Sequence, residues 1–409
     1  MTLRSISACL LVMSSSWACT ENFSVLDEAQ PAPASTSCGE CGNDELCAVD
    51  KCVSSFGVTT AAVGFRHACR VDYGRLFCWG ANRAGQLGLG DSQARDTPTQ
   101  VGEREDWIEV CAGEEHTCAV AEPGTLYCWG NNAFGQLGLG DNNPSDEPVE
   151  VRAITRVRRV ACGGDATCAL RDGRLYCWGS NKDLFSGGGG DVEDQPLFIG
   201  TPVEVLPDEH WKQLSLGAAH GCAIRTDGAL YCWGQNSSGQ LGLGNATAVA
   251  QPRQVGQSDE WRQVSAGEHH TCAVDESDAL YCWGGNAERE LGLGSSMRSR
   301  SEPSRVGEDS DWQSVSVGAA HSCAIKVQGG ALYCWGSNDR GQLGSSGSGT
   351  STGQPRAIQS DLRYRSVDAG KFHTCAIAAA QDQFCWGDNT EGQLGVGDTN
   401  LRTGPTLVQ

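Results

Sequence analysis

The tripeptide Cys-Trp-Gly occurs seven times in this chain of 409 residues, and each copy follows an earlier cysteine by 9 to 11 positions. The glycines of these tripeptides, from Gly80 to Gly387, are spaced 49 to 55 residues apart. A period of about 50 residues is typical of folds that place similar supersecondary units side by side. The cysteine pairs are Cys69 and Cys78, Cys118 and Cys128, Cys168 and Cys177, Cys222 and Cys232, Cys272 and Cys282, Cys323 and Cys334, and Cys375 and Cys385.

Each repeat contains short apolar segments separated by glycine turns. In the segment LYCW at residues 126–129, both alternating faces of the expected strand are apolar. Such a strand is expected to be buried on both sides. Seven repeats of this kind predict an all-β chain, with small sheets packed face to face around an axis as a seven-bladed β-propeller.

The ends of the repeat region predict how the ring closes. The motif Pro-x-x-Val/Ile begins at Pro98, Pro148, Pro202, Pro252, Pro303, Pro355 and Pro405. The first Cys-Trp-Gly unit has no such motif before it, and the last motif has no Trp-x-x-Val unit after it. We therefore expect the C-terminal strand at 405–408 to complete the blade begun by residues 58–69, which would leave no open sheet edge.

The motifs GQLGLG, Trp-Gly-x-Asn and His-x-Cys-Ala-Val resemble those of the regulator of chromosome condensation repeat family, over about residues 56–409. The resemblance implies a seven-bladed propeller, and it brings guanine-nucleotide exchange on a small GTPase as one candidate activity. The third repeat departs from the pattern, with Ala166 where the other six have histidine and LFSGGGG where others have GQLGLG. The fifth repeat has Glu290 in place of the glutamine of that loop.

A turn lies between the two cysteines of each pair, so the two arms of a hairpin would face each other at roughly 4.5–5.5 Å between Cα atoms. A disulfide spans roughly 4.4–6.8 Å. We therefore predict seven cross-strand disulfides, with buried free thiols as the alternative. Cys111 and Cys162 lie at adjacent positions of one strand in neighbouring repeats, and either a bridge between the repeats or two free thiols fits them.

The N-terminus predicts export. Residues 1–18 combine Arg4, an apolar stretch and a small-residue cleavage site, as signal peptides do. Cys19 is a candidate lipidated cysteine, although the residues before it fit a lipobox poorly. Residues 19–37 are expected to be a flexible tether. No other segment approaches the roughly 18 apolar residues that span a bilayer.

Residues 38–55 form a small Cys-rich module with Cys38, Cys41, Cys47 and Cys52. Two disulfides of undetermined connectivity are the favoured reading, and a zinc site is the alternative. The repeats occupy 56–409. Twenty cysteines follow Cys19, an even number that favours an exported protein over a cytosolic one with a disordered N-terminus. The expected location is the bacterial cell envelope, as an outer-membrane lipoprotein, or the extracellular space.

The net charge of −20 opposes binding to nucleic acid. We find no catalytic motif, and we expect no cofactor and no metal. The six recurring histidines are interpreted as structural, each ordering the turn before its own strand through hydrogen bonds. Variable residues before GQLG, and the insert at 182–200, are the candidate contacts with a partner. These candidates are Phe134, Leu184, Phe185, Phe198 and Arg340, although the insert could instead fold back on its own blade.

The sequence thus predicts an exported, monomeric, non-enzymatic scaffold that binds a protein of unknown identity. A membrane tether through a lipidated N-terminus is part of this prediction. A secreted enzyme inhibitor is one alternative. Nucleotide exchange on a GTPase and a carbohydrate-acting enzyme are further alternatives, and fold alone decides neither.

Overall fold

The computed structural model describes residues 45–48, 51–54, 58–182, 197–294, 296–345, 351–358 and 361–409. The chain divides into two units, Met1–Ser55 and Phe56–Gln409. In the first unit, β1 (Glu45–Ala48) and β2 (Lys51–Ser54) form an antiparallel hairpin in which Cys47 is opposite Cys52. The predicted signal peptide, the tether, Cys19, Cys38 and Cys41 lie outside the described residues, and only the backbone is described at Cys47 and Cys52.

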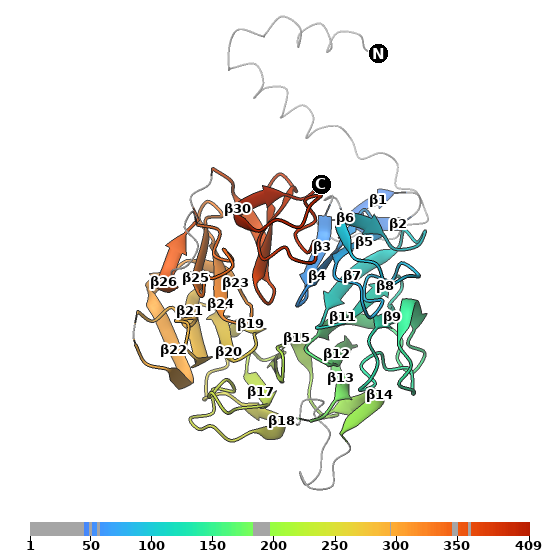
Figure 1. The fold of residues 1–409 in the computed structure, drawn as a ribbon. Helices are drawn as coiled ribbons and strands as arrows, with labels where there is room; N and C mark the ends of the chain where they lie inside the picture. The colour runs from blue at the N-terminus through green and yellow to red at the C-terminus, as the bar shows by residue number, and fades with distance from the viewer. Residues whose placement is uncertain are drawn as a thin grey trace, which may run out of the picture. The chain divides into compact units, whose positions relative to one another are not determined.

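The second unit consists of seven four-stranded antiparallel sheets arranged around an axis, numbered here as blades 1 to 7 in chain order (Figure 1). The prediction of an all-β seven-bladed propeller is confirmed. The innermost strands are β3 (Val58–Val63), β7 (Trp107–Ala112), β11 (Val157–Cys162), β15 (Trp211–Leu216), β19 (Trp261–Ala266), β23 (Trp312–Val317) and β27 (Tyr364–Ala369). The second strands are β4 (His67–Asp72), β8 (His116–Ala121), β12 (Ala166–Arg171), β16 (His220–Arg225), β20 (His270–Asp275), β24 (His321–Lys326) and β28 (His373–Ala378).

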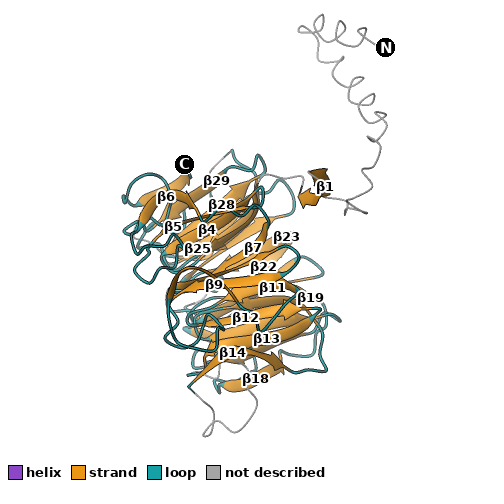
Figure 2. Cartoon of the chain, turned by 90° about the vertical axis from the view of Figure 1, so that its right-hand side faces the viewer, coloured by secondary structure: helices purple, strands orange, loops and turns teal. Residues whose placement is uncertain are grey.

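The two outer strands of each blade carry the Cys-Trp-Gly and Pro-x-x-Val motifs. The third strands are β5 (Arg75–Gly80), β9 (Thr125–Gly130), β13 (Arg174–Ser180), β17 (Leu230–Gly234), β21 (Ala279–Gly285), β25 (Leu332–Gly336) and β29 (Gln383–Gly387). The outermost strands are β6 (Arg95–Gln100), β10 (Ser145–Glu150), β14 (Phe198–Val205), β18 (Val249–Gln254), β22 (Ser299–Ser310), β26 (Thr352–Ala357) and β30 (Arg402–Leu407). Figure 2 shows the strands of this unit from the side.

The middle strands of each blade are buried on both faces, as their two-sided apolar pattern predicts. In blade 2, every residue of β8 is buried, and Leu126, Cys128 and Trp129 of β9 have no exposed surface. The layers between blades are filled mainly by these strands and by the tryptophans of Cys-Trp-Gly. Burial of apolar surface between neighbouring sheets is therefore the main force that holds the ring together.

The predicted closure of the ring is wrong. The C-terminal strand β30 pairs with β29 in blade 7, and β3 belongs to a blade made only of β3 to β6. Each Pro-x-x-Val strand returns antiparallel beside the Cys-Trp-Gly strand that precedes it in the chain, so every blade is one continuous segment. The ring closes without strand exchange, through contacts between blades 7 and 1. The Trp79 indole donates to the Gln393 carbonyl at 3.0 Å, and the Gly397 amide donates to the Asp96 carbonyl at 2.9 Å.

Within the described part of the chain, no helix is long and apolar enough to cross a membrane.

Candidate functional site

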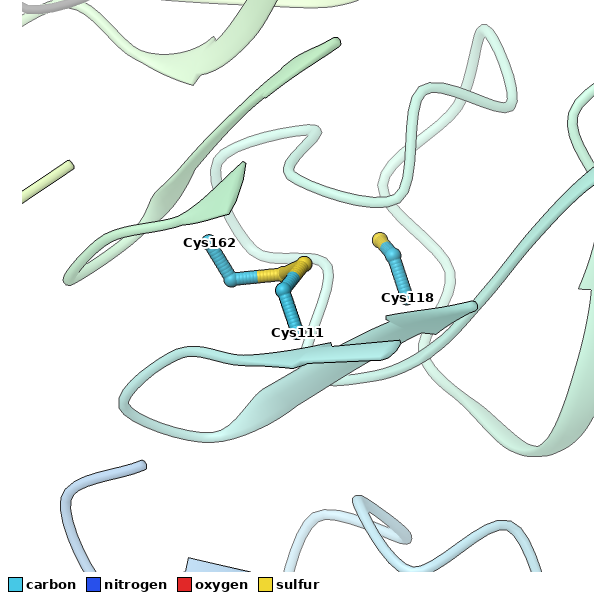
Figure 3. A group of neighbouring side chains, drawn as sticks. All are labelled: Cys111, Cys118 and Cys162. Atoms are coloured by element: carbon cyan, nitrogen blue, oxygen red, sulfur yellow. A yellow bond between two sulfur atoms is a disulfide. The ribbon is translucent and has the colours of Figure 1, made fainter. Parts of the chain in front are cut away.

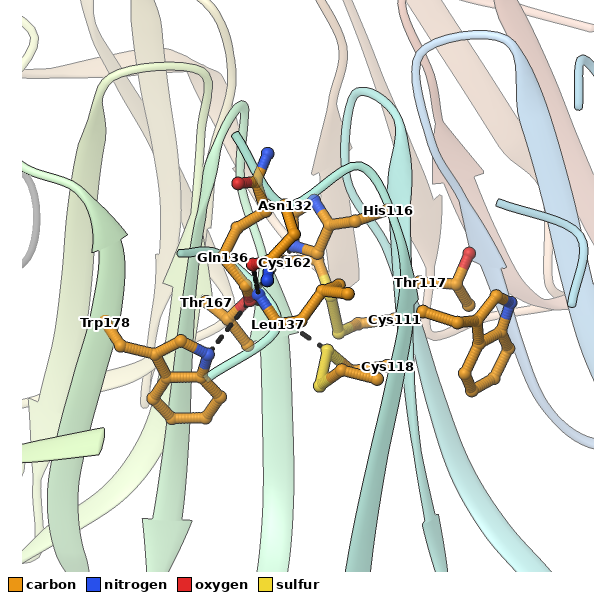
Figure 4. Close-up of a disulfide and its surroundings, with 12 residues drawn as sticks. Cys111, His116, Thr117, Cys118, Asn132, Gln136, Leu137, Cys162, Thr167 and Trp178 are labelled. Atoms are coloured by element: carbon orange, nitrogen blue, oxygen red, sulfur yellow. Dashed lines mark hydrogen bonds between the residues drawn. A yellow bond between two sulfur atoms is a disulfide. The ribbon is translucent and has the colours of Figure 1, made fainter. Parts of the chain in front are cut away.

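One hydrogen-bond network recurs at the blade junctions and absorbs most of the repeated motifs. At the junction of blades 2 and 3, the His116 imidazole contacts the Thr167 hydroxyl through Nε2 at 2.9 Å (Figure 4). Thr167 and Trp178 of blade 3 both donate to the carbonyl of Gln136 in the GQLG loop of blade 2, each at 2.9 Å. Because the threonine hydrogen is used in that bond, His116 is the donor through Nε2–H. The recurring histidines, tryptophans and GQLG loops thus join neighbouring blades.

The GQLG loop is itself held by the asparagine of Trp-Gly-x-Asn. In blade 2 the buried Asn132 side chain accepts from the Leu137 amide at 3.0 Å and donates to the Asp141 carbonyl at 2.9 Å. The glycine of Cys-Trp-Gly has a steric role, because Gly130 has φ of 104° and a Cβ there would lie 2.4 Å from the Glu115 carbonyl oxygen. These residues are structural, and none of them is free to act on a ligand.

The histidine contact is present at five junctions and is lost at the other two in different ways. The five pairs are His67 with Thr117, His116 with Thr167, His220 with Thr271, His270 with Ser322, and His321 with Thr374. Ala166 lies where the third blade would carry histidine, and the corresponding residue of blade 4 is Gly221, so both partners are absent together. At the closing junction Ala68 takes the hydroxyl's place, and neither ring nitrogen of His373 has a hydrogen-bond partner among the residues that the structure describes.

Replacing Thr271 by valine tests this network. The change removes the hydroxyl that accepts from His220 and donates to the Gln240 carbonyl at 2.8 Å, while it preserves the side-chain shape. An unsatisfied buried polar group costs about 1–3 kcal/mol, so we expect the free energy of unfolding to fall by that amount in urea titrations. Thr271→Ser is the matched control and should be nearly neutral, because Ser322 fills the equivalent position of blade 6. Equal losses for both variants would contradict this role of the hydroxyl.

Burial keeps all six histidines neutral. Desolvation lowers the pKa of His67 and His321 to about 4 and that of His116, His220, His270 and His373 to about 3. A histidine far from protonation and bonded to a hydroxyl of the next blade fits the structural role expected from the sequence. The expectation that each histidine orders the turn before its own strand needs correction, because five of the side chains bond to the neighbouring blade.

All seven predicted cysteine pairs are opposed across the second and third strands, with sulfur atoms at bonding distance. Their Cα atoms are 4.1 Å apart, slightly closer than the roughly 4.5 Å of an unbridged pair. Cys111 and Cys162 also form a disulfide, with Cα atoms 5.4 Å apart, and it joins blade 2 to blade 3.

A central channel of about 310 Å³ is lined by the innermost strands and the turns that follow them. Side chains on these strands clamp one blade to the next. The Ser215 and Ser265 hydroxyls accept from the Ala266 and Val317 amides at 3.0 and 3.1 Å. Cys111 and Cys162 occupy the positions that correspond to Ser215 and Ala266. At the junction of blades 2 and 3, a covalent bond therefore takes the place of a hydrogen bond.

One side of the ring carries both the Gly-x-x-His turns and the loops after Cys-Trp-Gly, and we call it the loop face. The two are joined by backbone hydrogen bonds, such as Asn131 N–H to the Glu115 carbonyl at 2.8 Å. These turns, which are Gly-x-x-His in six blades and Gly-x-x-Ala in blade 3, border the mouth of the channel. The two residues inside each turn differ between blades. In chain order they are Phe65-Arg66, Glu114-Glu115, Gly164-Asp165, Ala218-Ala219, Glu268-His269, Ala319-Ala320 and Lys371-Phe372.

The channel mouth is acidic on the side of blades 2 and 3. Burial, followed by the carboxylates of Glu114 and Glu115, raises the pKa of Asp165 to about 6. Burial also raises the pKa of Glu114, against the opposing charge of Lys371. Near the closing junction the mouth is cationic and aromatic instead, since the Lys371 ammonium lies 4.7 Å from the centre of the Phe65 ring. The sequence analysis did not identify these residues. Their variation between repeats, inside a motif that is otherwise nearly constant, could have indicated them as candidate contacts with a partner.

Of the residues predicted to bind a partner, Phe134 and Phe198 come from adjacent segments of blades 2 and 3. Their side chains are 37% and 40% exposed, and Leu197 beside Phe198 is 73% exposed. The loop of Phe134 lies against the start of β14, because the Gly140 amide donates to the Gly200 carbonyl at 2.9 Å. Arg340 lies in the loop of blade 6, away from these residues, and pairs with Asp388 of blade 7 at 3.9 Å. Leu184 and Phe185 lie outside the described residues.

The apolar residues and the acidic mouth are neighbours. Gln136, two positions after Phe134, donates to the Asp165 carboxylate at 3.1 Å. We call this combined surface the blade 2–3 patch. It consists of Phe134, Leu197, Phe198, Glu114, Glu115 and Asp165.

Comparison with known families decides the relationship that the motifs suggested. A model described as the regulator of chromosome condensation (RCC1) repeat matches residues 73–120, 123–170, 227–274, 277–325 and 329–377. The chain belongs to the RCC1 repeat family. Each matched RCC1 unit begins in the turn before the third strand of a blade, so the sequence repeat and the blade are out of phase.

Known members share the fold over most of this chain. The ultraviolet-B receptor UVR8 of Arabidopsis thaliana is 31% identical over 366 residues, which are 86% of this chain and 82% of UVR8. The human E3 ubiquitin-protein ligase HERC2 is 30% identical over 58% of this chain, a segment that is 5% of HERC2. Yeast RCC1 (Prp20), solved bound to Kap60, superimposes with a TM-score of 0.73 at 23% identity, covering 87% of this chain and 85% of that one. These relatives are eukaryotic.

Proposed function

We propose that the protein is a non-enzymatic scaffold that binds a partner protein through the blade 2–3 patch. The observation that carries this proposal is the placement of the exposed Phe134 and Phe198 beside the exposed Glu114 and Glu115 and the half-buried Asp165 on one part of the loop face. Exposed apolar residues grouped within a polar surround are typical of binding sites. The acidic rim and the net charge of −20 favour a partner segment in which apolar side chains are flanked by lysine or arginine.

The repeat architecture supports binding rather than catalysis. The recurring histidines, cysteines and tryptophans are used in joining and stapling the blades, and what varies is the loop face. Structural relatives bind proteins as well: yeast RCC1 was solved with Kap60, and Prp20p was studied for binding to Gsp1p and histones. For this chain we propose protein binding in general and carry over none of these partners.

Loss of the exposed phenylalanines should weaken binding without affecting the fold. We expect Phe134→Ser/Phe198→Ser to weaken the affinity for the partner at least tenfold, because anchors of this kind dominate interfaces. Partners would first be found by cross-linking in the native host, with wild-type and variant protein compared by quantitative mass spectrometry, and affinities then measured by calorimetry.

Val327→Ser is the matched control for that experiment. Val327 is 52% exposed and lies in the hairpin turn after β24, on the side opposite the loop face. Its replacement should leave the affinity unchanged, while added salt should weaken wild-type binding through the acidic rim. Unchanged binding by the phenylalanine variant would remove the blade 2–3 patch from consideration.

We also propose that the protein is exported to the cell envelope or the extracellular space. All sixteen cysteines whose side chains the structure describes lie in disulfides, and this supports an oxidising compartment. An intact mass of protein from its native host, before and after reduction and alkylation, tests the proposal. A chain that begins at Cys19 with bridged cysteines supports export, and an added lipid would identify the tether. A chain that begins at Met1 with free thiols would overturn it.

Nucleotide exchange is the second candidate, and the fold shared with yeast RCC1 is what favours it. Release of labelled GDP from a small GTPase, measured with and without the protein, separates the two functions. Inhibition of a secreted hydrolase by purified protein would instead identify the scaffold as an enzyme inhibitor.

A further inference from the structure

The Cys111–Cys162 disulfide differs from the seven hairpin disulfides in its surroundings. Cys111 and Cys162 line the central channel, Cys111 is 8% exposed, and Cys162 is partly exposed. Every cysteine of the hairpin disulfides is 2% exposed or less. Thiol–disulfide exchange requires that a thiolate reach a sulfur atom. Among the described disulfides, the bridge between blades 2 and 3 is therefore the one open to a reagent in the channel.

A second disulfide lies within reach of this bridge. Cys111 of β7 and Cys118 of β8 are directly opposite each other in neighbouring strands, and Cys118 is bonded to Cys128. The sulfur atoms of Cys111, Cys118 and Cys162 all lie within 4.8 Å of one another (Figure 3). A thiolate released at Cys111 thus faces a disulfide sulfur with no intervening residue.

We propose that Cys111–Cys162 is a thiol-exchange site that reacts with a small dithiol in the central channel and passes the exchange on to Cys118–Cys128. In the first step the dithiol attacks the bridge, forms a mixed disulfide and resolves it with its second thiol. The dithiol becomes a cyclic disulfide, and Cys111 and Cys162 receive two electrons and two protons. A channel of about 310 Å³ admits a molecule of this size.

The second step is an exchange without net redox change. The Cys111 thiol loses its proton, and its thiolate attacks the Cys118 sulfur. The Cys111–Cys118 bond forms, the Cys118–Cys128 bond breaks, and the Cys128 sulfur leaves as a thiolate that takes up a proton. The blades stay in place during both steps, because His116, Thr167, Gln136 and Trp178 still join blades 2 and 3 (Figure 4).

The first test is a time course with the folded wild-type protein. Dithiothreitol is added without denaturant, samples are quenched with iodoacetamide, and labelled cysteines are mapped by mass spectrometry. Cys111, Cys162 and Cys128 should be labelled at least tenfold faster than Cys222 and Cys232, while the far-UV circular dichroism stays constant. Labelling of all cysteines together, or only as the circular dichroism is lost, would overturn the proposal. Earlier labelling of Cys375, which borders a cavity between blades 7 and 1, would do the same.

The second test isolates the relay with Cys162→Ser and needs no reductant. Its unpaired Cys111 should yield a Cys111–Cys118 cross-linked peptide in a non-reducing digest, with Cys128 alkylated. The control Cys111→Ser/Cys162→Ser has no free thiol at this site and should keep Cys118–Cys128 intact. A Cys162→Ser protein in which Cys111 alone is alkylated would overturn the second step. If that variant does not fold, labelling of Cys128 in the wild-type time course decides the same question.

Discussion

Complete reduction of the eight described disulfides is expected to leave a chain that does not regain the propeller. Each hairpin pair closes a loop of 9 to 11 residues, and a loop of this size contributes about 2–3 kcal/mol by restricting the unfolded chain. Seven such contributions reach about 20 kcal/mol, which exceeds the 5–15 kcal/mol by which typical proteins are stable. The hairpin disulfides are thus expected to decide whether this ring is stable at all.

The measurement is refolding from denaturant with and without dithiothreitol, followed by the fluorescence of the buried tryptophans. The oxidised protein should recover its native spectrum, and the reduced protein should not. Cooperative refolding of the reduced chain with a similar denaturant midpoint would show that apolar burial and the bonds between blades suffice. The export proposal would then lose one of its supports.

Acidification from pH 7 to pH 5 is the second change with a large expected effect, and it should destabilise the fold. The pKa of each buried histidine is about 3 or 4 in the native state and about 6.5 in an unfolded chain. Between these values the unfolded state binds more protons, so stability falls as the pH falls. Six histidines act together in this direction.

Five carboxyl groups act in the opposite direction. They are Glu109, Asp165 and Asp368, together with Glu114 and Glu290, whose pKa burial also raises. Burial raises the native pKa of Glu109 and Asp368 to about 7 and that of Asp165 to about 6, so these groups hold protons in the native state that the unfolded chain releases. The six histidines and the carboxyl groups of Glu109, Asp165 and Asp368 together give a net uptake of about three protons on unfolding near pH 5.5, and Glu114 and Glu290 reduce it. Stability should therefore change by at most about 4 kcal/mol per pH unit there. Urea unfolding at pH 5.0, 5.5, 6.0 and 7.0 measures this slope.

His373→Ala provides the matched variant. The His373 ring has no hydrogen-bond partner in the described part of the chain, and Ala166 occupies the same position in blade 3. The variant should lower the slope by about one proton, or roughly 1.4 kcal/mol per pH unit, whatever its effect on absolute stability. A stability that does not vary between pH 7 and 5 would show that the histidines are not held neutral by burial.

The repeated part of the fold could be predicted from sequence because its signals are local. The strand LYCW at 126–129 is apolar on both faces, and its partner His116–Ala121 is also largely apolar. This pattern by itself predicts that both strands are buried between neighbouring sheets. The opposed cysteines could be paired for a similar reason, since a turn of a few residues fixes which positions of a hairpin face each other. Seven copies then determined the number of blades.

Contacts between blades were not visible in the same way. The recurring histidines were identified as structural, but their hydroxyl partners lie about 50 residues later in the chain, as His116 and Thr167 do. No periodicity within one repeat relates such positions. Glu114 and Asp165 at the channel mouth were not predicted. The constant residues on either side of them were interpreted as structural, and the variable positions between those residues were not considered.

The sequence by itself determined the all-β class, the seven repeats, the hairpin partners and the region of variable loops, because neighbours along the chain specify each of these. Only the tertiary structure decided that every blade is one continuous segment, that Cys111 reaches Cys162, and that Phe134 meets the start of β14 beside an acidic channel mouth. The physical reason is that a ring brings together residues from separate blades by packing, and packing depends on the sum of many weak contacts. The residues of one repeat specify its hairpins, because the paired positions are close together in the sequence. Where a blade begins and ends within the repeat depends instead on which strand the Pro-x-x-Val strand pairs with.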